Sequence, residues 1–187
     1  MARMQAAVLA EVLQRPLLAV IATTRKNGRP YLVPIWFLWE PDGRVAAQYP
    51  FYPEGSFWVI GTYARQWCQH LLVRPQASLC ITGEGVRGYI AVDCQVEPIE
   101  PHAHDIWPMA TRLAEKYVGS RSGPAATARF VANMRTEQRL LFRLTPHAWR
   151  AIDLTIYTGS RGDLAYQQAH ATAEPRADVE GRGVHPL

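Results

Sequence analysis

Residues 17–39 read LLAVIATTRKNGRPYLVPIWFLW, and this stretch decides the fold. Its two apolar runs, residues 17–24 and 31–39, are rich in β-branched and aromatic side chains, which is typical of β-strands. Asn27 and Gly28 stand between the runs, and both residue types tolerate the positive φ angles that a tight hairpin turn requires. The stretch therefore predicts an antiparallel β-hairpin.

The second strand of this hairpin is apolar on both faces. One alternating set of side chains comprises Tyr31, Val33, Ile35, Phe37 and Trp39, and the other comprises Leu32, Pro34, Trp36 and Leu38. Strands with two apolar faces are normally buried on both. We therefore expect one face to fill the interior of a barrel, and the other to be covered by a partner subunit, a helix or a ligand.

The rest of the chain alternates short strands with a few helices. We expect helices over residues 4–14, 63–72, 103–118 and 124–138, the last two separated by Gly119–Pro124. Further strands are expected over residues 56–62, 77–82, 89–99, 139–144 and 148–156. Turns are expected at residues 41–43, 83–85 and 145–146, with a long surface excursion over 44–55. This pattern predicts a mainly β fold, an antiparallel barrel with helical additions.

The composition fits one globular domain. With 187 residues, 48% of them hydrophobic, the chain is expected to fold over residues 1–157 and to end in a polar tail over 158–187. The net charge of +4 comes mainly from arginines that are spread along the sequence, so a nucleic-acid partner is not expected. Residues 16–22 are apolar, but the run is too short to cross a bilayer, and a cytoplasmic protein without a membrane partner is expected.

The three cysteines, Cys68, Cys80 and Cys94, are an odd number without a close pair, so they predict neither a disulfide framework nor a zinc site.

An anion site is predicted where the strand at residues 56–62 meets the helix that follows it. A helix N-terminus offers free backbone N–H groups and a partial positive charge. Thr62 is expected to cap this helix through its hydroxyl. Arg65 would lie in the first turn, where a cation opposes the helix dipole, unless an anion such as phosphate faces its guanidinium. A solvent-exposed arginine on an ordinary helix is the alternative interpretation.

Three stretches in this order, LAVIATTRKNGRPYLVPIWFLW, FWVIGTYARQWCQHLLVRPQASLCI and RLLFRLTPHAWRAID, resemble the pyridoxamine 5'-phosphate oxidase-like split-barrel family of flavin- and deazaflavin-dependent enzymes. The resemblance covers residues 5–155. It implies a split β-barrel that binds FMN or, as the alternative, the deazaflavin coenzyme F420. It also implies a homodimer, because such relatives usually build their cofactor sites between two subunits.

The resemblance also implies which residues bind the cofactor. The strand whose backbone meets the isoalloxazine ring corresponds to Val33, Pro34, Ile35 and Trp36, and the phosphate-binding segment corresponds to Ile60, Gly61, Thr62 and Arg65. Many relatives carry a lysine two residues after this arginine. Here that position is Trp67, so either one cationic contact to the phosphate is missing or Trp67 has another role, such as packing on the ring. Cys94 likewise stands where relatives commonly have a glycine.

Other candidate residues carry weaker signals. His102, His104 and Asp105 form an HxHD cluster that lacks further ligands at the spacing of a metal site, so no metal is expected. His70 is interpreted as a packed or surface histidine. Trp107, Tyr117 and Trp149 are interpreted as core or interface residues. The sequence contains neither a Gly-x-Ser-x-Gly motif nor a glycine-rich phosphate loop, and it identifies no catalytic residue.

The leading hypothesis is an oxidoreductase that uses FMN, or F420, to transfer hydride to or from a small organic molecule. A non-catalytic flavin- or haem-binding protein is the alternative from another class. A true pyridoxamine-phosphate oxidase is disfavoured, because the Arg-x-His-type motif of that enzyme has no match after Trp149.

Overall fold

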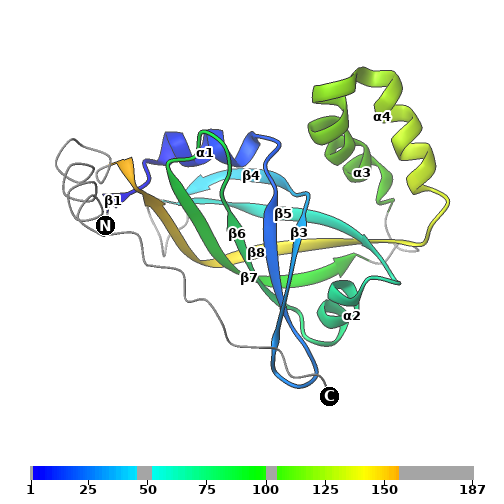
Figure 1. Ribbon diagram of the computed structural model, residues 1–187, viewed down its shortest axis with the longest axis horizontal. Helices are drawn as coiled ribbons and strands as arrows, with labels where there is room; N and C mark the ends of the chain where they lie inside the picture. Colours follow the sequence, from blue (N-terminus) through cyan, green and yellow to red (C-terminus); the bar gives the residue numbers. More distant parts are fainter. Residues whose placement is uncertain (1, 46–51, 100–104, 156–187) are drawn as a thin grey trace, which may run out of the picture. The chain divides into compact units, whose positions relative to one another are not determined.

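The computed structural model describes residues 2–45, 52–99 and 105–155. Its strands are β1 (Ala2–Arg3), β2 (Ala19–Thr24), β3 (Pro30–Ile35), β4 (Leu38–Val45), β5 (Pro53–Thr62), β6 (Gln76–Ile81), β7 (Gly88–Ile99) and β8 (Arg139–Asp153). Its helices are α1 (Ala6–Gln14), α2 (Gln66–Val73), α3 (Trp107–Ala114), the π-helix η1 (Glu115–Gly119) and α4 (Ser120–Met134). Figure 1 shows these elements coloured along the sequence.

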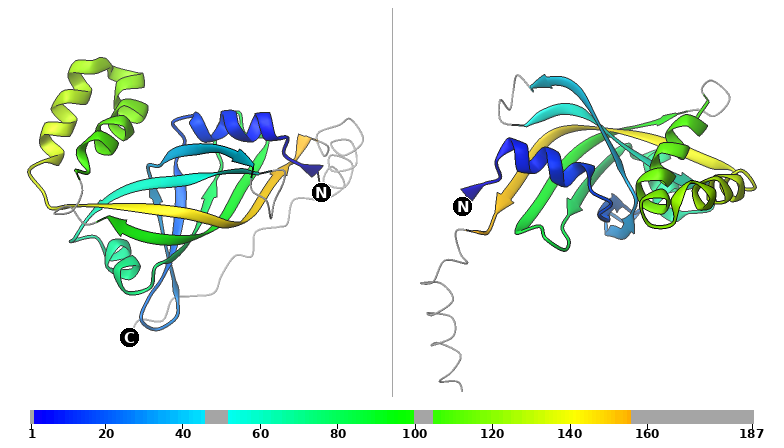
Figure 2. Two further views of the ribbon diagram at one scale, coloured as in Figure 1. Left: turned by 180° about the vertical axis from the view of Figure 1, so that it is seen from behind. Right: turned by 90° about the horizontal axis from the view of Figure 1, so that it is seen from above.

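The strands form one sheet in the order β3-β2-β6-β7-β8-β5-β4, with β1 paired to β8. Every pair is antiparallel. Strands β3 and β4 lie at opposite ends of this order, yet only Trp36 and Phe37 connect them. The sheet must therefore curl until its two ends approach each other, as Figure 2 shows from two sides. The predicted fold class, a split β-barrel with helical additions, is confirmed.

The barrel interior is the main hydrophobic core. Its largest fully buried side chains include Phe37 of the β3–β4 connection, Phe57 of β5 and Phe142 of β8. Helix α1 contributes Leu9 and Leu13 to the same core, and α2 contributes Trp67, Cys68 and Leu71. Each of these helices buries its apolar face against the barrel and exposes its opposite face to solvent.

The predicted hairpin is confirmed, with a difference in its turn. Strands β2 and β3 pair antiparallel from Ala19 opposite Ile35 to Thr24 opposite Pro30. Gly28 has a positive φ of 80°, whereas Asn27, like every other non-glycine residue that the structure describes, does not have a positive φ. The amide of Arg25 donates to the carbonyl of Arg29, so the turn is a three-residue loop rather than a two-residue Asn-Gly turn.

The expectation of one strand over residues 31–39 is wrong, because the strand is interrupted at Trp36 and Phe37. The interruption has a clear cause: the amide of Phe37 donates to the hydroxyl of Tyr117, 3.1 Å away, instead of to a neighbouring strand. Contacts with the helices explain in part why residues 31–39 are apolar on both faces. Trp36 and Leu38 lie in a second hydrophobic cluster with helical residues, whereas Leu32 remains 62% exposed.

Two other boundaries also differ from expectation. The predicted turn at residues 41–43 lies inside β4, where the register with β5 shifts between Pro41 and Val45. An irregular edge strand tolerates a proline because its N–H is not needed for pairing. The surface excursion predicted over 44–55 is shorter, since β4 ends at Val45 and β5 begins at Pro53, and residues 46–51 lie outside the described residues.

The two strands predicted at the end of the domain are one strand, β8. The register of β8 with β7 shifts at Thr145–Ala148, where Pro146 pairs with Cys94 and Ala148 with Asp93. This β-bulge accommodates the proline without ending the strand.

The helices begin later or run longer than the sequence predicts. Helix α2 begins at Gln66, not at residue 63, and Thr62 is the last residue of β5. The two helices predicted after β7 are separated only at Gly123, where φ is 77°, next to Pro124. Residues 119–122 are therefore helical, contrary to the expected break over Gly119–Pro124.

The chain divides into a compact unit, Met1–Asp153, and a second unit, Leu154–Leu187. The tail predicted over 158–187 lies outside the described residues. Within the described ranges, the helices are all too short or too polar to traverse a lipid bilayer.

Candidate functional site

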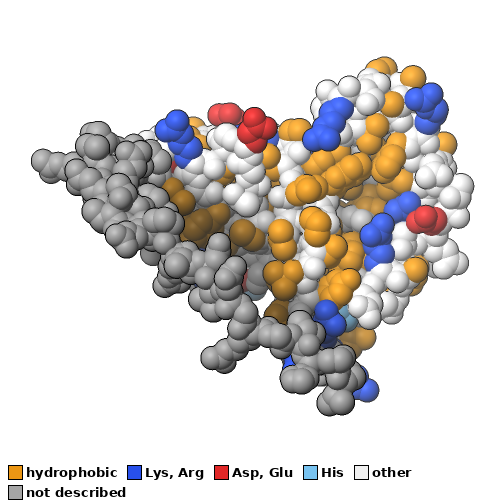
Figure 3. All heavy atoms as spheres, in the orientation of Figure 1, with side chains coloured by type: hydrophobic (Ala, Val, Ile, Leu, Met, Phe, Trp, Pro, Cys, Tyr) orange, Lys and Arg blue, Asp and Glu red, His pale blue; other side chains and the backbone are white. Residues whose placement is uncertain are grey.

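A cavity of about 350 Å³ lies where the end of β3, the start of α2 and the helical segment 107–134 meet. Its lining residues are Leu18, Pro34, Ile35, Trp36, Ile60, Arg65, Trp67, Leu113, Phe130 and Arg139. Figure 3 shows hydrophobic side chains gathered on this face of the molecule, with arginine or lysine side chains among them. The cavity combines an apolar wall with the guanidinium groups of Arg65 and Arg139.

The apolar wall is centred on Trp36, which is held between two helical aromatic side chains. Its ring stacks on Tyr117 with centroids 4.7 Å apart and an interplanar angle of 2°. Phe130 of α4 lies on it at 5.4 Å. Aromatic pairs at these distances contribute about 0.5–1.5 kcal/mol beyond the area that they bury. The wall is thus fixed in place before any ligand arrives.

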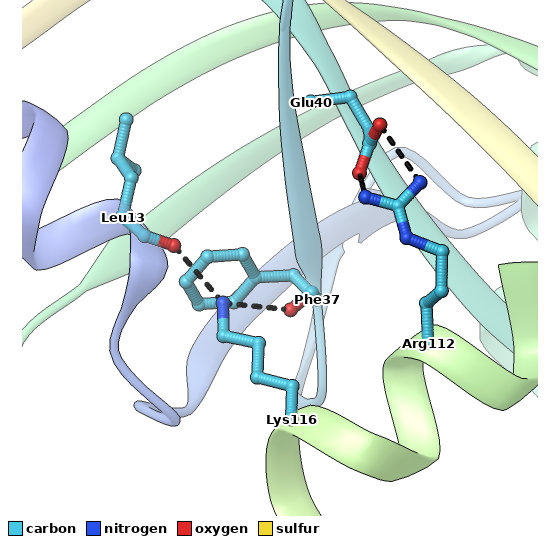
Figure 4. Close-up of polar contacts among 5 residues, drawn as sticks. All are labelled: Leu13, Phe37, Glu40, Arg112 and Lys116. Atoms are coloured by element: carbon cyan, nitrogen blue, oxygen red, sulfur yellow. Dashed lines mark hydrogen bonds and ion pairs between the residues drawn. The ribbon is translucent and has the colours of Figure 1, made fainter.

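The helical segment contacts the barrel through polar side chains, shown in Figure 4. Lys116 Nζ donates to the carbonyl oxygens of Leu13 at 2.9 Å and Phe37 at 3.1 Å, and it lies 4.0 Å from the centroid of the Phe37 ring. Burial lowers the pKa of Lys116 to about 7. Arg112 of α3 makes a two-point ion pair with Glu40 of β4.

Tyr117 adds a further anchor. Its hydroxyl donates to the carbonyl of Leu17 at 2.6 Å while accepting from the amide of Phe37. Burial raises the pKa of Tyr117 well above its ordinary value, so the hydroxyl keeps its proton. These contacts hold the cavity wall against α1, β4 and the β3–β4 connection.

The cationic side of the cavity comes from two elements. Arg65 is the N-cap residue of α2 and has an extended backbone, and its amide donates to the carbonyl of Thr62 at 3.1 Å. Arg139 is the first residue of β8, where it pairs in register with Thr62. The predicted cap by the Thr62 hydroxyl is wrong, because no side chain caps α2 and Thr62 belongs to β5.

Helix α2 approaches β5 closely at Gly61. A Cβ atom on Gly61 would lie 2.7 Å from Cζ2 of Trp67 and would also collide with the sulfur of Cys68. The Trp67 side chain is only 3% exposed and lies 5.8 Å from Phe142, measured between ring centroids. Glycine at this position is therefore what allows α2 to pack, and Trp67 fills the space between helix and sheet.

Six of the nine predicted cofactor-binding residues line this cavity: Pro34, Ile35, Trp36, Ile60, Arg65 and Trp67. Val33, Gly61 and Thr62 are not among the lining residues. Val33 packs against the barrel core, and Thr62 is 8% exposed. Sequence reasoning missed Leu18, Leu113, Phe130 and Arg139. No local motif marks these four, although the position of Arg139 opposite Thr62 follows once the register of β5 and β8 is known.

The other candidates from the sequence lie elsewhere or are structural. Thr23 Oγ1 and His70 Nδ1 are 2.9 Å apart, and Tyr31 contacts the same imidazole edge-on, so His70 joins α2 to the hairpin. Tyr117 and Trp149 are buried. His102 and His104 lie outside the described residues, within which no group of three metal-ligating side chains occurs. Burial raises the pKa of Cys68 to about 12 and that of Cys94 further, which makes both thiols poor nucleophiles.

Two larger cavities are less suited to an anionic ligand. One of about 740 Å³ beside β4, β5 and β8 is lined by the carboxylates of Glu40, Asp42 and Glu54. Another of about 640 Å³ lies between α3 and α4, and its lining residues include one arginine, Arg135, and the carboxylate of Glu115. The cavity beside Trp36, in contrast, joins aromatic walls to two arginines without a carboxylate among its lining residues. This donor set fits a planar ring system that carries a phosphate.

Comparisons with known proteins agree with this fold. The family model described as pyridoxamine 5'-phosphate oxidase matches residues 6–153. A conserved hypothetical protein from Mycobacterium tuberculosis is similar in structure, with a TM-score of 0.60, 19% identity and coverage of 95% of this chain and 93% of that one. The comparison with curated protein sequences gave no significant match.

Two further solved structures share the fold at low identity. A protein named F420 reductase has a TM-score of 0.52 and 23% identity, with coverage of 75% of this chain and 94% of that one. The haem storage protein HutZ from Vibrio cholerae has a TM-score of 0.54 and 17% identity, with coverage of 79% and 95%.

Proposed function

Because the chain belongs to the pyridoxamine 5'-phosphate oxidase family, we propose that the cavity beside Trp36 binds a phosphorylated flavin-type cofactor, with FMN as the first candidate. The protein would use it to transfer hydride to or from a small organic substrate. The observation that carries this proposal is the joining, in one cavity, of a fixed aromatic wall and two arginines. A bound flavin itself supplies the hydride chemistry.

The residues of this chain would bind, orient and shield the cofactor. Pro34, Ile35 and Trp36 present the end of an edge strand to the cavity, where a flat ring can lie along the backbone. Arg65 stands at the N-terminus of α2, and the first turn of a helix leaves backbone N–H groups without acceptors inside the helix. The helical wall containing Leu113 and Phe130 would exclude water from one side.

Cofactor titrations test the phosphate assignment. FMN and F420 are titrated into the wild type, Arg65→Ala and Arg74→Ala, the last being the C-cap residue of the same helix. Loss of a charge-assisted contact typically costs about 1.5–3 kcal/mol, so Arg65→Ala is expected to bind about 10- to 150-fold more weakly. Arg74→Ala is expected to match the wild type. Equal affinity of Arg65→Ala and the wild type would refute the assignment.

The choice between FMN and F420 is decided by the same titrations, together with an absorption spectrum and mass analysis of any molecule that co-purifies. The residues lining the cavity serve both cofactors, since each combines a planar tricycle with a phosphate. We rank FMN first because it is the more widespread of the two.

A non-catalytic flavin- or haem-binding protein is the second candidate. One observation favours a non-catalytic flavin-binding protein: the cavity-lining residues in the described part of the chain include no histidine, cysteine, tyrosine or carboxylate that could act as a general acid or base. The same lining offers no side chain that usually ligates haem iron, so this cavity favours flavin over haem. Bound cofactor that is not reduced by NADPH or by reduced deazaflavin, across a panel of small substrates, would support this candidate over the enzyme.

We also propose a homodimer that buries the outer face of the sheet. Leu32 and Pro34 of the edge strand β3 are exposed, and in register beside them lie Ala22 and Val20 of β2. A face with this composition is a typical interaction surface. Sedimentation at micromolar concentration is expected to give a dimer.

Leu32→Glu is expected to weaken this dimer. Val8→Glu, which replaces an exposed apolar residue of α1, is expected to leave it intact. A wild-type monomer would contradict the proposal.

A further inference from the structure

The phosphate side of the cavity lacks a cation that the resemblance predicts. In many split-barrel relatives, a lysine follows two residues after the arginine that corresponds to Arg65. This chain has Trp67 instead, and its indole is 3% exposed and packed between Gly61 and Phe142. Helix α2 therefore supplies one cationic side chain to the cavity where two are expected.

Arg139 lines the same cavity from another strand. It is the first residue of β8 and stands opposite Thr62, the last residue of β5. Because the chain passes from Thr62 through a short turn to Arg65, the strand pairing fixes both arginines at the same corner of the barrel. The side chain of Arg139 is only 14% exposed.

The guanidinium of Arg139 is oriented by contacts at the end of α4. Its Nε donates to the carbonyl of Met134 at 3.1 Å, and one terminal nitrogen lies 3.1 Å from the carboxylate of Glu137. Neither contact uses the second terminal nitrogen. A guanidinium held in this way keeps part of its planar fork available for another oxygen ligand. Glu137 is 55% exposed, so water screens its attraction to the arginine.

We propose that Arg139 is a second cationic contact to the phosphate of the cofactor, and that it supplies from β8 the charge that Trp67 does not supply from α2. This inference rests on the proposed function. A nearly buried arginine is favourable where its charge meets an anion, and a phosphate beside two guanidiniums accepts several charge-assisted hydrogen bonds. The ring of the cofactor would contact Trp36, so removal of Arg139 is expected to weaken phosphate binding more than ring binding.

The test compares FMN with riboflavin, which has the same ring system but no phosphate. Both are titrated by isothermal calorimetry into the wild type, Arg139→Gln and Arg143→Gln. Arg143 is a matched control, because it lies on the same strand but faces solvent in an ion pair with Glu97. Arg139→Gln is expected to lower the FMN affinity about 10- to 150-fold and to leave the riboflavin affinity within about twofold. Arg143→Gln is expected to change neither.

A second variant covers the case in which Arg139→Gln does not fold. Glu137→Gln changes an exposed side chain and removes the carboxylate that competes with phosphate for Arg139. It is expected to raise the FMN affinity a few-fold without changing the riboflavin affinity. An unchanged ratio of the two affinities would overturn the inference.

The outcomes separate this inference from the proposed function. If the wild type prefers FMN to riboflavin and Arg139→Gln keeps that preference, Arg139 does not contact the phosphate and the proposed function stands. If Arg139→Gln weakens both ligands equally, its role is structural and the inference is wrong. If the wild type binds none of FMN, F420 and riboflavin, the proposed function is wrong, and the inference that rests on it is wrong as well.

Discussion

Replacing Lys116 with methionine is predicted to change how the stability of the protein depends on pH. The ordinary lysine pKa is 10.5, and burial lowers that of Lys116 to about 7. Between these two values the unfolded chain holds a proton that the folded chain does not, so the free energy of unfolding rises with pH over this window. Below pH 7 both states are protonated, and the folded protein bears the full cost of a buried ammonium.

The size of this effect follows from the contacts of Lys116. At about 1.36 kcal/mol per pKa unit, the difference from 10.5 sets a ceiling of about 5 kcal/mol. Lys116 is partly exposed, so solvent screening reduces this to about 2–3 kcal/mol. The carbonyls of Leu13 and Phe37 and the Phe37 ring favour the ammonium and prevent a deeper fall.

Other buried groups act in the opposite direction at higher pH. The pKa values of Cys68, Cys94 and Tyr117 are raised by burial, so these groups keep protons that the unfolded chain loses above about pH 9. The wild type is therefore expected to be most stable between about pH 8 and 9. The difference between the wild type and Lys116→Met cancels most of this second effect and isolates the lysine.

The assay is urea unfolding followed by tryptophan fluorescence from pH 6.5 to 10, under reducing conditions. The stability of the wild type relative to Lys116→Met is expected to increase by about 2 kcal/mol between pH 7 and 10. Lys26 is the one other lysine of the sequence and is exposed, so Lys26→Met is expected to give a curve parallel to the wild type. A pH-independent difference between the wild type and Lys116→Met would refute the reasoning.

Three further substitutions test the packing of the site, each measured by urea unfolding at pH 7.5. Gly61→Ala places a Cβ atom 2.7 Å from the Trp67 indole and is expected to destabilise the fold by about 1–3 kcal/mol, whereas no loss would mean that α2 shifts freely. Tyr117→Phe leaves the buried amide of Phe37 without its acceptor and is expected to cost about 1–3 kcal/mol. Arg112→Ala removes a half-exposed ion pair and is expected to cost less than about 1 kcal/mol, and a larger loss would show that this pair anchors α3.

Local patterns predicted most of the barrel. The hairpin at residues 17–39 was identified by two β-rich runs around Asn27-Gly28, because strand propensity and turn chemistry act over a few residues. The same local reasoning failed at Pro41–Gly43 and Thr145–Pro146. Both were interpreted as turns, but strand pairing with distant segments carries the chain through them as strand irregularities. Such pairing is set by partners that a sequence window does not contain.

The residues that line the cavity beside Trp36 were predicted on the strand side and missed on the helical side. Pro34, Ile35 and Trp36 were identified through the resemblance, and they do line the cavity. Leu113 and Phe130 follow ordinary helical spacing, which predicts that they face the protein but does not predict which residues they contact. Their position depends on anchors such as Tyr117, whose hydrogen bonds reach residues 80 and 100 positions away in the chain.

Trp67 and Arg139 are best understood as two parts of one arrangement. The space between α2 and β5 is narrow at Gly61, and the indole of Trp67 fills it and packs against Phe142. An aromatic residue at position 67 satisfies this apolar environment but carries no charge. The adjacent strand position opposite Thr62 offers an alternative place for a cation, near the end of α4, where a carbonyl and a carboxylate hold it. Core packing and ligand charge can therefore be met together, because strand pairing brings residues 62 and 139 to the same corner.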